Sequence, residues 1–188
     1  MPLPGERVAL HIFEPRYQAL FAKLEANELE EFGIVCTAQG QGATAPFWGG
    51  IMRLVFSNPP DSHGHRNAVL QCISLFQVDH IQDLRPPSPE TYPTGSIRRI
   101  QDWKNWRIGP ETKNEIQRFD EALNESLAAM NPLVTEAMLH YSLQPTERLS
   151  ILGQTASDRR DYLFSQTLKF KRLISEQEAL KNGGYFPN

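Results

Sequence analysis

The spacing of hydrophobic positions changes about halfway along the chain. Up to about residue 105 they form short runs separated by glycine and proline, a pattern typical of strands in a small sheet. From 110 to 182 the apolar residues recur every three or four positions, which is the period of amphipathic helices. The sequence therefore predicts an α+β chain, with a β-rich subdomain over 1–107 and an α-helical subdomain over 108–188.

One helix is embedded among the predicted strands of the first segment. Pro15 stands at a favourable first-turn position, and the apolar spacing after it predicts a helix over 15–31. The proline-rich stretch 85–95 cannot be a central strand, because proline has no amide donor. Short strands around one helix indicate a barrel-like sheet. We expect strands over 8–13, 32–37, 51–56, 68–81 (with a bend near 71–74) and 96–103, and a surface loop over 57–67.

The second segment predicts a helical bundle. Proline marks the start or the interruption of its helices, and glycine follows their ends. We expect helices over 110–130, 133–141, 145–152 and from about 155 to 182.

The most specific motif lies near the start of the chain. Pro4-Gly5-Glu6 is followed by LHIFEPRY over 10–17. This run resembles the opening signature of the Lon substrate-binding domain family, and looser similarity continues through 32–35, 70–78, 149–151 and 158–180.

The resemblance implies a fold and a role. Members have a PUA-like β pseudo-barrel with one embedded helix, followed by a C-terminal helical bundle. In full-length Lon proteases this region recognises substrates ahead of an ATPase and a peptidase. For this chain it implies a non-catalytic polypeptide-binding module, such as an adaptor in protein quality control, that uses no cofactor. Its partners would be unfolded or apolar polypeptide segments, or a partner protein.

The chain also departs from the family pattern. No phosphate-binding loop of the G-x-x-x-x-G-K-[ST] type occurs, no Ser-Lys protease signature follows, and 188 residues are too few for a peptidase domain as well. We therefore expect no enzymatic activity. Members usually have about ten more residues before the Pro-Gly, forming a first barrel strand. Only 1–3 stand in that place, so either the start is misassigned or truncated, or the barrel lacks a strand. In the second case we expect an uncovered sheet edge through which copies could associate.

The polar groups of the motif favour a structural role over catalysis. A general base at His11, oriented by Glu14, is one alternative. The other is that the motif shapes the strand-to-helix corner, with the guanidinium of Arg16 bridging loops. We assign the structural role to His11, Phe13, Glu14, Pro15, Arg16 and Tyr17.

Two further groups could bind a metal or act as a nucleophile. His63 and His65 lie near Asp61, but in a proline-glycine loop without an evident third strong ligand, so a solvated turn is favoured. Cys36 and Cys72 lie in apolar runs, where burial raises a thiol pKa and lowers reactivity. We expect no metal site and no disulfide.

The aromatic residues near the join of the two segments suit peptide binding. Tyr92, Trp103 and Trp106 surround the end of the proline-rich stretch. Aromatic anchors are typical of binding surfaces. The same residues could instead fix the two halves by packing. We retain Tyr92, Trp103 and Trp106 as the candidate peptide-binding residues.

Charge bears on the alternative function, an RNA-binding PUA-like module. The net charge is −3, and neither half has an excess of basic residues. Nucleic-acid binding depends on clustered lysine and arginine, so nucleic acid is not the favoured partner. The basic residues of 159–172 are interrupted by acids at helical spacing, as on a solvated helix face. The start lacks a signal-peptide pattern, and no apolar run approaches the roughly 20 residues of a membrane span. We expect a cytoplasmic protein.

Overall fold

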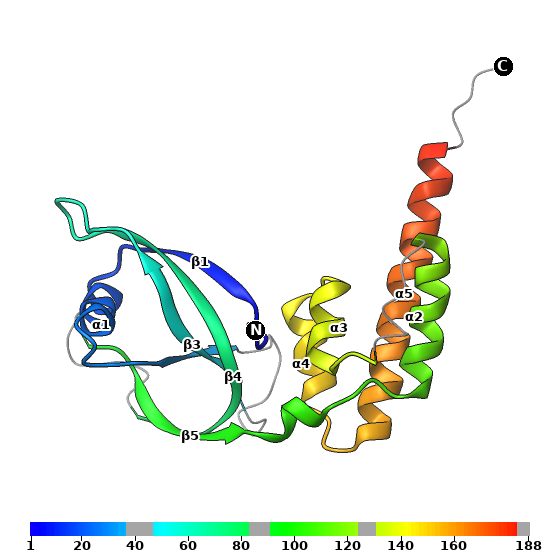
Figure 1. Cartoon of the computed structure of the whole chain (residues 1–188), viewed down its shortest axis with the longest axis horizontal. Coiled ribbons are helices and arrows are strands. Elements are labelled where there is room, and N and C mark those ends of the chain that lie inside the picture. Colours follow the sequence, from blue (N-terminus) through cyan, green and yellow to red (C-terminus); the bar gives the residue numbers. More distant parts are fainter. Residues whose placement is uncertain (37–46, 83–90, 124–130, 184–188) are drawn as a thin grey trace. The chain divides into compact units, whose positions relative to one another are not determined.

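The computed structural model describes residues 1–36, 47–82, 91–123 and 131–183. The chain forms two compact units, Met1–Trp103 and Lys104–Asn188. The first contains the sheet and one helix, and the second contains the remaining α-helices (Figure 1). The predicted α+β class is therefore confirmed. The elements of the first unit are β1 (Arg7–Ile12), α1 (Pro15–Glu25), β2 (Phe32–Cys36), β3 (Trp48–Ser57), β4 (Arg66–Gln82) and β5 (Thr94–Ile100).

The long strand β4 organises the antiparallel sheet. One edge of β4 pairs with β3, and the other pairs first with β1 and then with β5. On its far side, β3 pairs with the short strand β2. The expected bend near 71–74 is confirmed as a register shift, because Ser74 pairs with Ile51 while Cys72 pairs with the next residue, Met52.

Ion pairs of Glu31 connect the start of β2 both to its neighbour β3 and to β5, with which β2 does not pair among the described residues. Glu31, just before β2, binds Arg53 on β3 at 2.9 Å and also binds Arg99 on β5. Burial raises the pKa of Glu31, but the hydrogen bonds from Arg99 and Arg53 outweigh it, so the net pKa is lowered. These contacts bring β5 to the start of β2, which agrees with a barrel-like curvature of the sheet.

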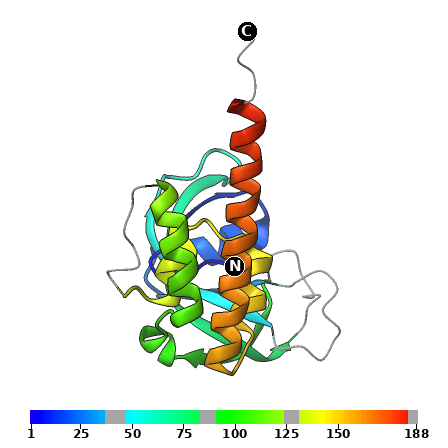
Figure 2. The same ribbon diagram turned by 90° about the vertical axis from the view of Figure 1, so that its right-hand side faces the viewer.

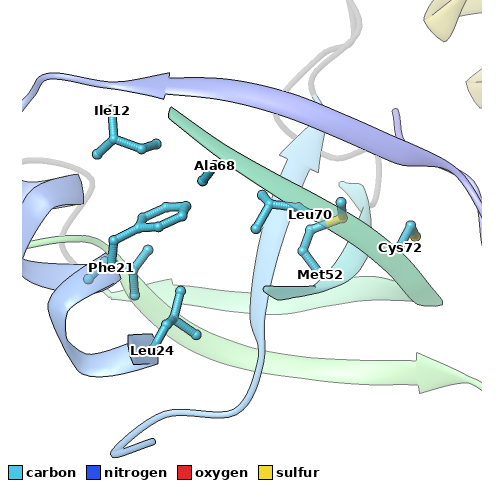
Figure 3. Packing of buried hydrophobic residues seen from close by; sticks show 8 residues of the cluster. Ile12, Phe21, Leu24, Met52, Ala68, Leu70 and Cys72 are labelled. Atoms are coloured by element: carbon cyan, nitrogen blue, oxygen red, sulfur yellow. The ribbon is translucent and has the colours of Figure 1, made fainter. Parts of the chain in front are cut away.

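The core of the first unit lies between α1 and the inner face of the sheet. Phe21 and Leu24 from α1 point toward Ala68 and Leu70 on β4 (Figure 3). The large apolar residues of α1 recur at helical spacing, so one side of the helix can bury them against the strands. The buried members of this core are Ile12, Leu20, Phe21, Leu24, Met52, Ala68, Leu70 and Cys72.

Helix α1 is shorter than the sequence predicted. It ends at Glu25 rather than at residue 31. Asn27 adopts a left-handed conformation with φ of 56°, and the amides of Glu28 and Leu29 donate to the carbonyl oxygen of Lys23. Asparagine tolerates this conformation, which reverses the chain before β2. The apolar spacing beyond Glu25 reflects packing of Leu29 against the core rather than further helix.

Two glycines let the ring of Phe76 lie against the β2–β3 pair. A Cβ at Gly49 would meet Cζ of Phe76 at 2.3 Å, and a Cβ at Gly33 would meet it at 2.8 Å. Phe76 is 1% exposed, so the ring fills space that alanine at either position would need. These positions require glycine for close packing rather than for a turn.

The N-terminal residues extend the pairing of β1 with β4. The amide of Gly5 donates to the carbonyl oxygen of Cys72, and the amide of Cys72 donates to the carbonyl oxygen of Glu6. Within the described parts of the chain, β1 and β2 each pair with one strand only. The expected association of copies through an uncovered edge stays a prediction.

The second unit is helical, as predicted. Its α2 and α5 lie side by side (Figure 2), and α4 also packs on α5. The carboxylate of Asp161 on α5 accepts hydrogen bonds from the amides of Glu111 and Thr112, in the first turn of α2. Some expected elements lie outside the described residues. These are helical residues 124–130, strand residue 37, and residues 85–90 of the proline-rich stretch. The elements are η1 (Asp102–Asn105, across the boundary of the units), α2 (Pro110–Leu123), α3 (Val134–His140), α4 (Pro145–Leu152) and α5 (Ser157–Gly183).

Candidate functional site

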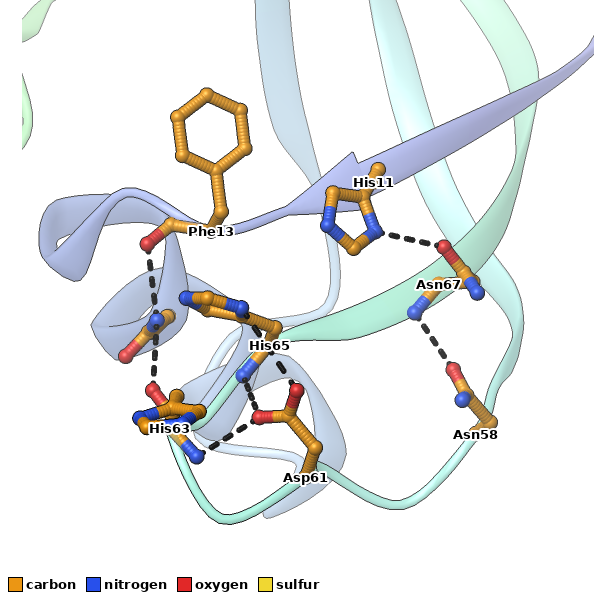
Figure 4. A network of polar contacts seen from close by, with 8 residues as sticks. His11, Phe13, Asn58, Asp61, His63, His65 and Asn67 are labelled. Carbon is orange, nitrogen blue, oxygen red and sulfur yellow. Dashed lines mark hydrogen bonds and ion pairs between the residues drawn. The ribbon is translucent and has the colours of Figure 1, made fainter.

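The polar corner between β1 and α1 contains the sequence motif. His11 is exposed on β1, and its Nδ1 is hydrogen-bonded to Oδ1 of Asn67 on β4 at 2.8 Å (Figure 4). Glu14 pairs instead with Arg16 at 2.5 Å. The described contacts of His11 thus do not include the carboxylate that the catalytic alternative needed.

Arg16 contributes locally rather than between loops. Besides the pair with Glu14, its guanidinium lies 4.9 Å from the centre of the Tyr17 ring. Among the contacts described for Arg16, the expected bridge to other loops does not occur. Pro15 opens α1, as the sequence predicted.

Gln18 holds the corner to the loop between β3 and β4. Its side-chain amide donates to the carbonyl oxygens of Phe13 at 2.9 Å and of His63 at 3.3 Å. Sequence reasoning missed this residue, because the loop lies 45 positions away along the chain. The available signal was a polar side chain just after the first turn of a helix.

The histidine-containing loop is a carboxylate-stabilised turn. Oδ1 of Asp61 accepts the amides of His63 and His65, both at 2.8 Å (Figure 4). Gly64 has φ of 80°, a conformation that favours glycine. Hydrogen bonds from the amides of His65 and His63 lower the pKa of Asp61. Of the residues that the structure describes, no group of three His, Cys, Asp or Glu is arranged to hold a metal ion.

The two cysteines are free and differ in environment. Cys72 is buried on β4, and this burial raises the pKa of its thiol to about 12. Such a thiol is almost wholly protonated at neutral pH and therefore a poor nucleophile. Cys36, at the end of β2, is half-buried.

The three candidate peptide-binding aromatics belong to different environments. Tyr92 is half-buried in the first unit and packs against its core, with Nζ of Lys23 3.4 Å from its hydroxyl oxygen. Trp103 is half-buried in η1, the last residue of the first unit. Trp106 belongs to the second unit, where the guanidinium of Arg160 lies 4.4 Å from its ring centre. Their joint role in binding stays a prediction.

A groove that the sequence did not reveal lies beside the end of β3. It has a volume of about 800 Å³, which is within the range of ligand sites. It is lined by the end of α1 and the chain up to residue 30, by the last residues of β3, and by Asn58 and Pro59. Apolar side chains reach it from both elements. Its lining includes Leu24, Leu29, Glu30, Leu54, Val55 and Phe56.

The basic residues of α5 are largely engaged within the second unit. Lys171 pairs with Glu147, and Arg172 pairs with Glu115 and Glu176. Each local pair reduces the charge that is free to meet a phosphate backbone. Arg159 and Lys169 are exposed, as expected for a solvated helix face, whereas Lys171 and Arg172 are paired with acidic side chains.

Comparison with known proteins gives the fold. No family model and no curated protein matches the sequence. Among solved structures, a Lon N-terminal domain protein from Xanthomonas campestris is similar with a TM-score of 0.58 and 19% identity, covering 85% of this chain and 88% of that one. The N-terminal domain of a Mycobacterium avium complex Lon protease has a TM-score of 0.56 and 13% identity, covering 90% and 92%. The chain thus has the fold that the motif over 4–17 predicted.

Proposed function

We propose that this chain, which has the fold of Lon N-terminal domains, is a non-catalytic module that binds polypeptide. The observation that carries the proposal is the likeness to two such domains over 85% and 90% of the chain. One of those structures comes from a Lon protease, an enzyme whose substrates are polypeptides. A role as an adaptor in protein quality control, in the cytoplasm, would make use of such a recognition module.

The chemistry of the described residues supports binding rather than turnover. The imidazole of His11 and the carboxylates of Glu14 and Asp61 bind neighbouring protein groups. The buried thiol of Cys72 is protonated. None of these arrangements supplies an activated nucleophile beside a general base. We therefore expect the purified protein to hydrolyse neither ATP nor casein, and cleavage abolished by a mutation in its own chain would contradict this.

No helix in the described parts of the chain is long and apolar enough to cross a membrane. The comparisons do not favour the RNA-binding alternative, and the local pairing on α5 gives it no support either. Titration with single-stranded RNA at low and high salt tests that alternative directly, because phosphate binding weakens steeply with salt.

The test of polypeptide binding uses an unfolded protein as the probe. Fluorescein-labelled lactalbumin, reduced and carboxymethylated so that it cannot refold, is titrated with the full chain and followed by anisotropy. We expect saturable binding that changes little with salt. Absence of such binding, together with tight, salt-sensitive binding to RNA, would overturn the proposal.

The candidate aromatics are tested in the same assay. Burying a ring contributes roughly 1.5–3 kcal/mol, so if these aromatics form the binding site, Trp103→Ala should weaken binding about tenfold or more. Tyr162→Ala removes an aromatic ring that is 43% exposed on α5 and serves as a control. If Trp103 only packs the chain, its replacement lowers the melting temperature and leaves binding by the folded protein unchanged.

A further inference from the structure

The outer edge of β3 is only partly paired. Over Trp48–Met52 this edge pairs with β2, but β2 begins at Phe32, opposite Met52. Of the remaining residues, Arg53–Ser57, all except Val55 pair with β4 on their other side. Within the described residues, no strand pairs with Arg53–Ser57 along the edge that faces away from β4. The short length of β2 thus leaves a segment of strand edge open.

The backbone direction at this edge follows from the pairing of β4. Cys72 exchanges its backbone hydrogen bonds with Gly5 and Glu6, on the β1 side. The backbone amides and carbonyls of successive residues point to opposite edges of a strand. The amide and carbonyl of Gln71 therefore point toward β3, where Gln71 pairs with Arg53. The amide and carbonyl of Leu54, the next residue of β3, therefore point to the open edge.

A β-bulge turns apolar side chains toward solvent at the same place. Leu54 pairs with Leu70, but Phe56 pairs with Val69, so Val55 is the extra residue. Bulges re-aim side chains and increase the local twist. Val55 is 46% exposed and Phe56 is 59% exposed.

The open edge and these side chains line the groove of about 800 Å³ described above. Leu24 and Leu29 also line the groove; Leu24 belongs to the core and Leu29 packs against it. The groove therefore offers unpaired backbone groups next to apolar surface. This combination suits an extended chain, whose backbone can pair with the edge while alternate side chains enter the groove.

Charge indicates which extended chains fit best. Of the charged residues in the lining, Arg53 is paired with Glu31, and Glu25 is paired with Arg66 at 2.5 Å. Glu30 is exposed, and none of the ion pairs described for the chain includes it. Counted over the lining residues alone, Glu25 and Glu30 carry two negative charges and Arg53 carries one positive charge, an excess of one negative charge that favours a basic residue in the occupant.

We propose that the groove beside β3 binds an extended polypeptide segment with apolar and basic residues, which adds as a strand along Arg53–Ser57. This proposal rests on the proposed polypeptide-binding function and locates it. Backbone pairing is independent of sequence, so the site would accept many unfolded segments. Segments whose side chains fit the apolar lining and the carboxylate of Glu30 would bind with higher affinity than others.

The first experiment changes the probe. A fluorescein-labelled peptide of alternating valine and lysine is titrated with the full chain, beside the same peptide with N-methyl groups on alternate residues. N-methylation removes the amide donors of one edge and keeps the side chains. We expect the methylated peptide to bind at least tenfold more weakly. Equal affinities would overturn strand addition.

The second experiment changes the protein. Phe56→Ser removes the exposed ring from the groove, and the matched control Phe13→Ser removes a ring of similar exposure, 56%, that does not line it. We expect Phe56→Ser to weaken binding of the valine-lysine peptide about fivefold and the control to change it less than twofold. Glu30→Lys should reduce the preference for lysine over aspartate in the peptide severalfold. Melting curves of each variant confirm folding.

The outcomes separate this proposal from the broader function. If unfolded lactalbumin binds but Phe56→Ser and Phe13→Ser have equal effects, the groove is not the site and the proposed function stands. If neither lactalbumin nor the peptide binds, both proposals fail. Loss of peptide binding with Phe56→Ser alone, together with weak binding of the methylated peptide, supports the groove.

Discussion

Replacing Gly49 by alanine tests how closely Phe76 packs against the β2–β3 pair. A Cβ at this position would lie 2.3 Å from Cζ of Phe76 and 2.5 Å from the carbonyl oxygen of Ile34. The ring is buried, and the carbonyl belongs to the neighbouring strand β2. Relief of both contacts therefore requires the ring and the backbone of a strand to move.

The expected cost follows from these two contacts. Overpacking a core costs about 1–3 kcal/mol, and the backbone contact puts Gly49→Ala at the upper end, about 3 kcal/mol. For a chain of this size, that lowers the melting temperature by roughly 6–12 °C. Gly33→Ala is the matched comparison, because its nearest contacts are all with the ring of Phe76, the shortest at 2.8 Å. We expect it to cost about 1–2 kcal/mol.

Urea denaturation followed by circular dichroism measures these differences, and Phe76→Leu separates their causes. The shorter side chain should relieve most of the cost of Gly33→Ala in a double-mutant cycle. It should relieve only part of the cost of Gly49→Ala, because the clash with Ile34 remains. A Gly49→Ala protein as stable as the original would refute the reasoning, and so would complete rescue by Phe76→Leu.

Three further predictions concern long-range contacts and the core. Asp161→Ala should lower stability by about 0.5–2 kcal/mol, as for a lost helix cap, measured by urea denaturation; no change would show that water replaces the carboxylate. The lowered pKa of Glu31 contributes stability that is present above its ordinary value of 4.5 and is lost as the pH falls through the lower folded value. Acid titration of Glu31→Gln should therefore show less loss of stability below about pH 4.5 than the original chain, and identical profiles would contradict the ion pairs with Arg53 and Arg99. Iodoacetamide at pH 8 should leave Cys72 unmodified in the folded protein, because a pKa of about 12 leaves on the order of one thiolate in ten thousand; peptide mass spectrometry before and after unfolding checks this.

Local chemistry made much of the fold predictable. Pro15, Pro110 and Pro145 open α1, α2 and α4, because proline fits the first turn and fits poorly in the interior of a helix. Alternation of large aliphatic residues predicted β1, and Gly153 follows the end of α4 as expected. The motif LHIFEPRY predicted the fold of the whole chain, which no single element could do.

The prediction failed where a local pattern had two possible causes. The apolar spacing over 15–31 continued past the end of α1, because Leu29 packs on the core from a turn rather than from a helix. The left-handed backbone conformation of Asn27 ends α1. Asparagine at this position is compatible with a helix that ends here and with one that continues. Arg16 was expected to bridge loops, but the structure gives that connection to Gln18.

The sequence by itself thus determined the order and type of the elements, the α+β class and the motif that indicates a Lon-like fold, because these depend on residues close together in the chain. Only the tertiary structure decided which distant groups meet: Asp161 with the start of α2, Glu31 with Arg99, and Gln18 with His63. It also decided that β2 is too short to pair with the end of β3, which creates the groove. Such contacts depend on strand register and chain path, and hydrophobic periodicity carries no information on either.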